Sequence, residues 1–138
     1  MKKYRLGVFE TNSSTSHSLV IMSKEDAWRW KNNPDLWVVK DGYWYGLDNP
    51  PTKGKLYTTE ELIDIFSKGK YQPKTAEEFT YDNEGFESYD EYIKSYLSDE
   101  GMIRYEDWNE IELEHDDEEF VSPSGDKMVA YSVYGTEY

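Results

Sequence analysis

The chain has 138 residues and a formal net charge of −14, because 29 Asp and Glu outnumber 15 Lys and Arg. A charge of this sign repels nucleic acid and anionic membranes and attracts basic partners, so neither direct nucleic-acid binding nor membrane binding is expected. With no cysteine, the chain has no disulfide, thiol nucleophile or zinc–thiolate site, and no stretch approaches the ~20 apolar residues of a membrane-spanning helix. We therefore expect one domain over residues 1–138, located in the cytoplasm.

Strand and helix signals alternate through the first part of the chain. Alternating polarity predicts a strand over residues 3–10, and the apolar run 19–22 predicts a second strand, with the hydroxyl-rich residues 11–18 as the loop of a hairpin. Ser23 is typical of a helix N-cap, and the helix that it opens is expected to end before Pro34.

A second hairpin is predicted over residues 36–47, where Asp41-Gly42 separates two apolar runs and supplies the positive φ angles of a two-residue turn. Three further helix starts carry the pattern of a capping box, in which a Ser or Thr and a Glu three residues later exchange hydrogen bonds with the backbone. These pairs are Thr58 with Glu61, Thr75 with Glu78, and Ser88 with Glu91.

The acidic residues are concentrated in residues 77–119, which hold 18 of the 29 and only two basic side chains, Lys94 and Arg104. Dense like charge costs the compact state free energy through self-repulsion, so its segregation suggests a use. Within this segment one apolar helix face is predicted at i, i+3, i+4, i+7 and i+8. Its members are Tyr89, Tyr92, Ile93, Tyr96 and Leu97.

Residues 109–115 alternate strictly between acidic or polar and apolar side chains, which predicts a half-buried strand with a row of carboxylates on its solvent face. The four acidic residues 116–119 are expected to turn the chain. Residues 122–126 form a second turn cluster, and residues 127–134 are expected to be the last strand.

Together these elements predict an α+β fold in a single domain: a mainly antiparallel sheet of five to seven strands with about three short helices packed on one face. The apolar content is rich in aromatic residues, with 13 Tyr, 5 Trp and 5 Phe, some of which we expect at a contact surface. A stacking platform for bases normally sits in a basic groove, so core packing is the better expectation for most of these rings. The rings considered are Trp28, Trp30, Trp37, Trp44, Trp108, Tyr43 and Tyr45.

The row of carboxylates is the first candidate site. Alternate residues of a strand lie about 6.8 Å apart, and each strand of duplex DNA presents one phosphate per ~3.4 Å, so a rigid row of carboxylates can occupy a basic nucleic-acid groove. The simpler alternative is solvated surface. The predicted partner-binding residues are Glu110, Glu112, Glu114, Asp116, Asp117, Glu118 and Glu119, with Asp90 and Glu91 as the rim.

The same stretch also offers oxygen and imidazole ligands for calcium, magnesium or manganese, namely Glu114, His115, Asp116 and Asp117. It lacks the spacing of an EF-hand, in which a glycine follows three alternating oxygen ligands. We therefore predict no metal site and no cofactor.

The hydroxyl-rich loop is the second candidate site. Hydroxyl and backbone N–H groups between two strands can cradle a phosphate, and an imidazole can add a donor. The glycine-rich phosphate motifs are absent, and no acid is placed to orient a Ser–His pair, so a catalytic site is not expected. The possible ligand-binding residues are Asn12, Ser13, Ser14, Thr15 and His17, with hydrogen bonding to the loop's own backbone as the simpler alternative.

Residues 7–18, GVFETNSSTSHS, resemble the N-terminal signature of a group of small proteins of bacteriophages and their bacterial hosts, whose usual run is GVFETNSSSTHS. This chain has Thr15-Ser16 where the usual order is Ser-Thr. The resemblance implies a phage or prophage setting, and it leaves the loop as a possible ligand site in the group.

The leading functional hypothesis is therefore a non-enzymatic phage-type inhibitor, acting in the host-cell cytoplasm. It would present its acidic surface to a basic host protein that handles nucleic acid, such as a CRISPR nuclease or a restriction enzyme. The alternative is a protein that binds or sequesters a nucleotide or other phosphate compound in the loop 11–18. A hydrolase that uses His17 is a third, minor hypothesis.

Overall fold

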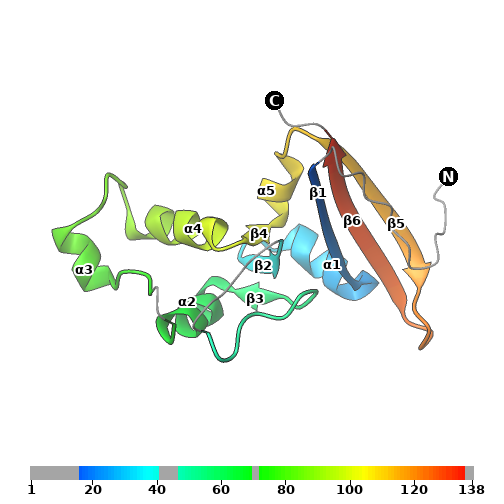
Figure 1. Ribbon diagram of the computed structural model, residues 1–138, viewed down its shortest axis with the longest axis horizontal. Coiled ribbons are helices and arrows are strands. Elements are labelled where there is room, and N and C mark those ends of the chain that lie inside the picture. The colour runs from blue at the N-terminus through cyan, green and yellow to red at the C-terminus, as the bar shows by residue number, and fades with distance from the viewer. Residues whose placement is uncertain (1–15, 41–46, 70–71, 136–138) are drawn as a thin grey trace.

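The computed structural model describes residues 16–40, 47–69 and 72–135, and these residues form five helices and six strands (Figure 1). In chain order they are β1 (Ser16–Ser23), α1 (Lys24–Asn32), β2 (Leu36–Val39), β3 (Tyr57–Thr58), α2 (Thr59–Ser67), α3 (Ala76–Tyr81), α4 (Tyr89–Asp99), β4 (Met102–Arg104), α5 (Tyr105–Asn109), β5 (Glu114–Val121) and β6 (Lys127–Gly135).

The strands form two antiparallel sheets of three strands each, a first sheet with the order β1-β6-β5 and a second with the order β3-β2-β4. The predicted α+β class with antiparallel pairing is confirmed. The strands are divided between two sheets where one was expected, and the described helices number five where about three were expected. Both edges of β2 are occupied at Trp37, by Tyr57 on one side and Arg104 on the other, so β2 cannot also extend the first sheet.

Strand β2 lies between two hydrophobic cores. All four of its residues are buried, and their side chains alternate: Leu36 and Val38 belong to a first core, and Trp37 and Val39 to a second. The first core also contains side chains of α1, α5 and the first sheet, and the second contains side chains of α2 and α4. This arrangement gives the molecule an elongated shape, with the first sheet at one end and α3 at the other (Figure 1).

Local hydrogen bonds begin the helices where the sequence predicts. The Ser23 hydroxyl accepts from the backbone N–H of Asp26 at 3.1 Å, and α1 ends at Asn32, ahead of Pro34. Complete capping boxes open α2 and α3, and the Ser88 hydroxyl accepts from the backbone N–H of Glu91 to open α4. On α4 the predicted apolar face packs into the second core.

The N-terminal hairpin prediction needs one correction. Residues 16–18 lie in β1, which pairs with β6 from Ser16 opposite Gly135 to Ser23 opposite Met128, so they are not part of a loop. The nine-residue strand β6 is long enough to pair with these polar residues as well as with the apolar run after them. The predicted strand 3–10, the loop residues 11–15 and most of the second strand of the hairpin 36–47 lie outside the described residues.

The largest correction concerns residues 105–121. The predicted strand over residues 109–115 is wrong up to residue 113, because residues 105–109 form helix α5 and residues 110–113 connect it to β5. Only its last two residues, Glu114 and His115, lie in a strand, at the start of β5. The acidic run 116–119, expected to turn the chain, instead lies within β5 and pairs with β6 from Glu114 opposite Tyr134 to Val121 opposite Lys127. The predicted turn cluster 122–126 and the last strand are confirmed, with a hydrogen bond of 2.9 Å from Ser122 N–H to the Asp126 carbonyl.

None of the helices in the described parts of the chain has the length and apolar character needed to cross a membrane.

Candidate acidic binding surface

The acidic run lies on β5, the outer strand of the first sheet as far as the chain is described. Because strand side chains alternate between faces, His115, Asp117 and Glu119 share the face of the first core, opposite Val133, Tyr131 and Val129 of β6. The other face carries Glu114, Asp116 and Glu118. The seven predicted partner-binding carboxylates are therefore not on one face.

Five of those seven carboxylate side chains are exposed, and they follow one another along the α5–β5 connection and the first half of β5. Between them, Ile111 and Leu113 pack against the first core, so the predicted division into apolar and acidic sides holds even where the backbone is not a strand. We call this exposed group the acidic edge: Glu110, Glu112, Glu114, Asp116 and Asp117.

The last two predicted residues are less accessible. Glu118 is 7% exposed, opposite Ala130, which is 1% exposed. Glu119 is half-buried and forms an ion pair of 3.5 Å with Lys24 at the start of α1. A partner that approaches the acidic edge would therefore meet neither of them as a freely solvated charge.

The two residues predicted as the rim, Asp90 and Glu91, do not lie next to the acidic edge. Asp90 and Glu91 lie in the first turn of α4, where Asp90 pairs with Lys94 at 2.8 Å. Helix α4 packs in the second core and β5 borders the first, so the two elements lie toward opposite ends of the molecule (Figure 1).

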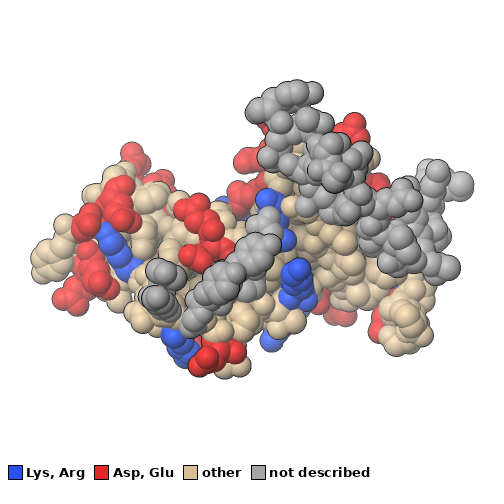
Figure 2. All heavy atoms as spheres, viewed as in Figure 1, with Lys and Arg blue, Asp and Glu red and all other residues tan. Residues whose placement is uncertain are grey.

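Charge over the rest of the acidic segment is partly compensated. Figure 2 shows acidic side chains grouped at the α3–α4 end and again near α5. At the first of these places Lys74 pairs with Asp82 at 2.9 Å and with Glu84 at 3.5 Å, and the hydrogen bond from Lys74 lowers the pKa of Asp82. Near α5, Arg104 pairs with Glu106 and Asp107, each at 3.0 Å. The acidic edge holds five exposed carboxylates within eight residues, the closest spacing of exposed carboxylates in the described parts of the chain.

Aromatic side chains support the acidic edge from inside. Trp30 is 1% exposed and contacts Tyr105, Trp108 and Tyr131 edge-on, with ring centroids 5.1, 6.2 and 5.4 Å away. Burial, reinforced by Tyr105 and Asp117, raises the pKa of Tyr131 to about 12, so its hydroxyl keeps its proton at neutral pH. The backbone beneath Asp117 is thus held by a packed aromatic cluster.

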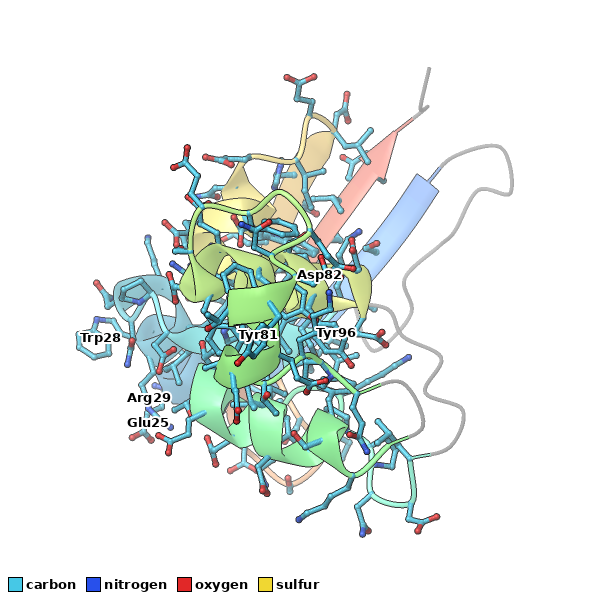
Figure 3. The ribbon with its side chains drawn as sticks, turned by 90° about the vertical axis from the view of Figure 1, so that its left-hand side faces the viewer. Glu25, Trp28, Arg29, Tyr81, Asp82 and Tyr96 are labelled. Atoms are coloured by element: carbon cyan, nitrogen blue, oxygen red, sulfur yellow. The ribbon has the colours of Figure 1, made fainter. Side chains whose placement is uncertain are left out.

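The expectation of core packing is confirmed for Trp30, Trp37 and Trp108, each at most 2% exposed. Trp28 is different, because it is 68% exposed and projects from α1 beside Arg29 (Figure 3). Tyr81 is 86% exposed but belongs to α3, so Trp28 and Tyr81 do not form one platform (Figure 3). Tyr43, Trp44 and Tyr45 lie outside the described residues.

The possible metal ligands of β5 do not converge. Glu114 and Asp116 share one face of the strand while His115 and Asp117 share the other, and His115 Nε2 donates a hydrogen bond of 2.7 Å to the Ile111 carbonyl. Within residues 16–40, 47–69 and 72–135, no group of three or more His, Asp or Glu side chains is arranged to hold a metal ion.

Of the predicted loop site, Asn12, Ser13, Ser14 and Thr15 lie outside the described residues, and His17 is placed only by its backbone, in β1 opposite Tyr134. Next to it the structure reveals a hollow of about 440 Å³ that the sequence reasoning missed. Ser18, Lys40, Lys53 and Gly54 contribute to its lining. The only sequence signal for it is the basic excess of residues 1–76, which does not single out either lysine.

The sequence matches no protein-family model, and no curated protein or solved structure is significantly similar to the chain. Function must therefore be inferred from the residues of the chain itself.

Proposed function

We propose that this protein is a non-enzymatic inhibitor of the phage type, which binds a basic, nucleic-acid-handling protein of the host cytoplasm through its acidic edge. The observation that carries the proposal is the run of five exposed carboxylates along the α5–β5 connection and the outer strand of the first sheet. A CRISPR nuclease or a restriction enzyme has the basic groove that such a run fits. The phage setting is supported by the resemblance of residues 7–18 to the phage and prophage signature.

Electrostatics favours a binding role for this surface over simple solubility. Charges of one sign steer an oppositely charged partner and raise the association rate, and the effect falls as salt screens them. A charged outer strand also prevents edge-to-edge aggregation of sheets. One or two charges are enough for that purpose, whereas the acidic edge continues beyond the strand to Glu110 and Glu112.

Charge reversal tests the proposal directly. Glu112, Glu114 and Asp116 would be replaced together by Lys, and the protein assayed for inhibition of DNA cleavage by restriction and CRISPR nucleases of the host. The matched control reverses three exposed carboxylates elsewhere, Glu77, Glu87 and Asp99. The edge variant should lose inhibition while the control keeps it. Equal inhibition by both variants, or none by the wild type, would contradict the proposal.

A second candidate function, binding of a nucleotide or other phosphate compound, is supported by the hollow next to β1. The Ser18 hydroxyl and the ammonium groups of Lys40 and Lys53 are groups that bind phosphate, and all three residues line it. A ligand present at 100 times its Kd stabilises a protein by about 2.7 kcal/mol, which a thermal shift assay detects. Nucleotides should raise the Tm of the wild type but not of Lys53→Ala. A panel without any stabilising nucleotide would remove this candidate.

A further inference from the structure

Beside the acidic edge, the structure contains a hollow of about 180 Å³ between α1, α5 and the first sheet. Its lining combines aromatic rings with polar and charged side chains from four elements. The lining residues are Lys31 of α1, Tyr105, Trp108 and Asn109 of α5, His115, Asp116 and Asp117 of β5, and Tyr131 of β6.

We propose that this hollow is an anchor pocket for an arginine side chain of the protein partner. The inference rests on the proposed function, and it names the group on the partner that the acidic edge would recognise. A guanidinium group stacks on aromatic rings and donates several hydrogen bonds to carboxylate and carbonyl oxygens, so it matches a lining of tyrosine rings with an aspartate at the rim.

The negative charge of the pocket comes from β5. Asp117 is exposed and lies on the strand face that borders the first core, opposite Tyr131. The neighbouring Asp116 also contributes to the lining, but its side chain belongs to the opposite face of β5. The Asp117 carboxylate therefore gives the mouth the sign that a cationic side chain requires.

The side chains that line the pocket are preorganised by their packing. Tyr105 and Tyr131 both contact the fully buried Trp30, and their ring centroids are 6.2 Å apart at an angle of 69°. Trp108 is 2% exposed, and its ring meets that of His115 edge-on. A pocket whose walls are already packed loses little conformational entropy on binding, which is the setting in which a single anchor residue contributes most to an interface.

The size of the hollow suits the end of one side chain. A cavity of about 150 Å³ holds benzene, so a hollow of about 180 Å³ accepts a planar guanidinium with its neighbouring methylene groups. A nucleotide or a folded segment of a partner would be too large for it.

The protein already places a cation of its own at this site. The Lys31 ammonium lies 6.0 Å from the centroid of the Tyr105 ring, the outer range of a cation–π contact. Lys31 is exposed and belongs to the last turn of α1, so it can swing away at little cost. A partner's arginine would displace it, and Lys31 would act as a weak internal competitor.

The test uses the whole chain and a small probe, N-acetyl-arginine amide, with N-acetyl-citrulline amide as its neutral counterpart. Binding would be followed by NMR at the Trp108 indole N–H and the His115 backbone amide. The arginine probe should shift both signals in a saturable way, and the citrulline probe should not. Asp117→Asn should weaken binding by about tenfold or more, the size of one lost charge-assisted hydrogen bond. The matched control Asp99→Asn, at an exposed aspartate of α4 outside both the hollow and the acidic edge, should change binding less than about twofold.

Lys31→Gln makes the test independent of any loss of folding, because it should tighten binding of the arginine probe by about threefold. The proposal is overturned if the arginine probe gives no saturable shift at these signals, if citrulline binds equally well, or if Asp117→Asn and Asp99→Asn have the same effect. These outcomes do not depend on a host partner. A pocket that binds arginine in a protein that inhibits no nuclease would refute the proposed function and leave the anchor pocket in place.

Discussion

Replacing Thr59 with Val should destabilise the junction between α2 and the second sheet. The Thr59 hydroxyl accepts a hydrogen bond of 2.9 Å from Trp37 Nε1 and donates one of 2.6 Å to Asp35 Oδ1. Valine has nearly the shape of threonine but neither donates nor accepts, so the change removes both hydrogen bonds and leaves the packing.

The two losses differ in size. Trp37 is 0% exposed, so its indole N–H would be left without a partner away from water, which costs about 1–3 kcal/mol. Asp35 is exposed, and water replaces the hydroxyl at its carboxylate with little net change. We expect a loss of about 2 kcal/mol in the free energy of unfolding. For 138 residues the unfolding entropy is about 0.29 kcal/mol/K, so Tm should fall by about 7 °C.

Urea unfolding, followed by tryptophan fluorescence and by circular dichroism, measures this change. Thr59→Ser is the control, because it keeps the hydroxyl and should retain most of the stability. If Thr59→Val lost less than about 0.5 kcal/mol, or if Thr59→Ser lost as much as Thr59→Val, the hydrogen bond from Trp37 would not be what holds this junction.

Three other changes test the charges, the caps and the buried tyrosine. Replacing the carboxylates of the acidic edge with Gln and Asn should relieve their repulsion and so raise the urea midpoint of unfolding at low salt. The increase should be smaller in 0.5 M NaCl, where the Debye length is about 4 Å, and an increase that does not depend on salt would contradict this. Thr75→Ala removes the capping box of α3, which contributes about 1 kcal/mol to the stability of the helix. Because α3 has no buried residue, we expect faster amide hydrogen exchange over residues 76–81 and little change in the stability of the whole protein. Because the pKa of Tyr131 is raised to about 12 in the folded protein, its contribution is complete below the ordinary pKa of about 10 and is lost as the pH rises toward 12. Between pH 9.5 and pH 11.5 the free energy of unfolding of the Tyr131→Phe variant should therefore fall less than that of the wild type. An equal fall in both proteins would refute the raised pKa of Tyr131.

The sequence predicts well what depends on neighbouring residues. The N-caps at Ser23, Thr58, Thr75 and Ser88 are all in place, because a cap needs only a hydroxyl and a backbone N–H three residues away. The turn at residues 122–126 is local for the same reason, and Gly125 adopts the positive φ of 91° that favours glycine.

Long-range pairing decides the parts that the sequence did not predict. Strand β5 contains six acidic or imidazole side chains in succession, a composition of low strand propensity, yet all eight of its residues pair with β6. The alternation over residues 109–115 has the period of a strand, but helix α5 carries Trp108 into the first core, and this burial outweighs the local pattern. The separation of Asp90 and Glu91 from the acidic edge has the same origin, because it follows from which core each element joins.

The acidic edge could be predicted only in part. Exposure of Glu110, Glu112 and Glu114 follows from the apolar residues between them, which pack inward whatever the backbone conformation. The burial of Glu118 depends on its position opposite Ala130 in a sheet that the sequence did not assemble.

The central claim is that the acidic edge binds a basic protein that handles nucleic acid. A pull-down from a host lysate with active defence systems tests it most directly, with the wild-type chain and the Glu112, Glu114 and Asp116 charge-reversal variant side by side in 0.1 M and 0.5 M NaCl. Mass spectrometry should identify a basic nuclease or nucleic-acid-binding complex that the wild type retains in 0.1 M NaCl and releases in 0.5 M NaCl. The charge-reversal variant should retain this complex at neither salt concentration. Recovery of the same proteins by both chains, or of no basic protein by the wild type, would contradict the claim.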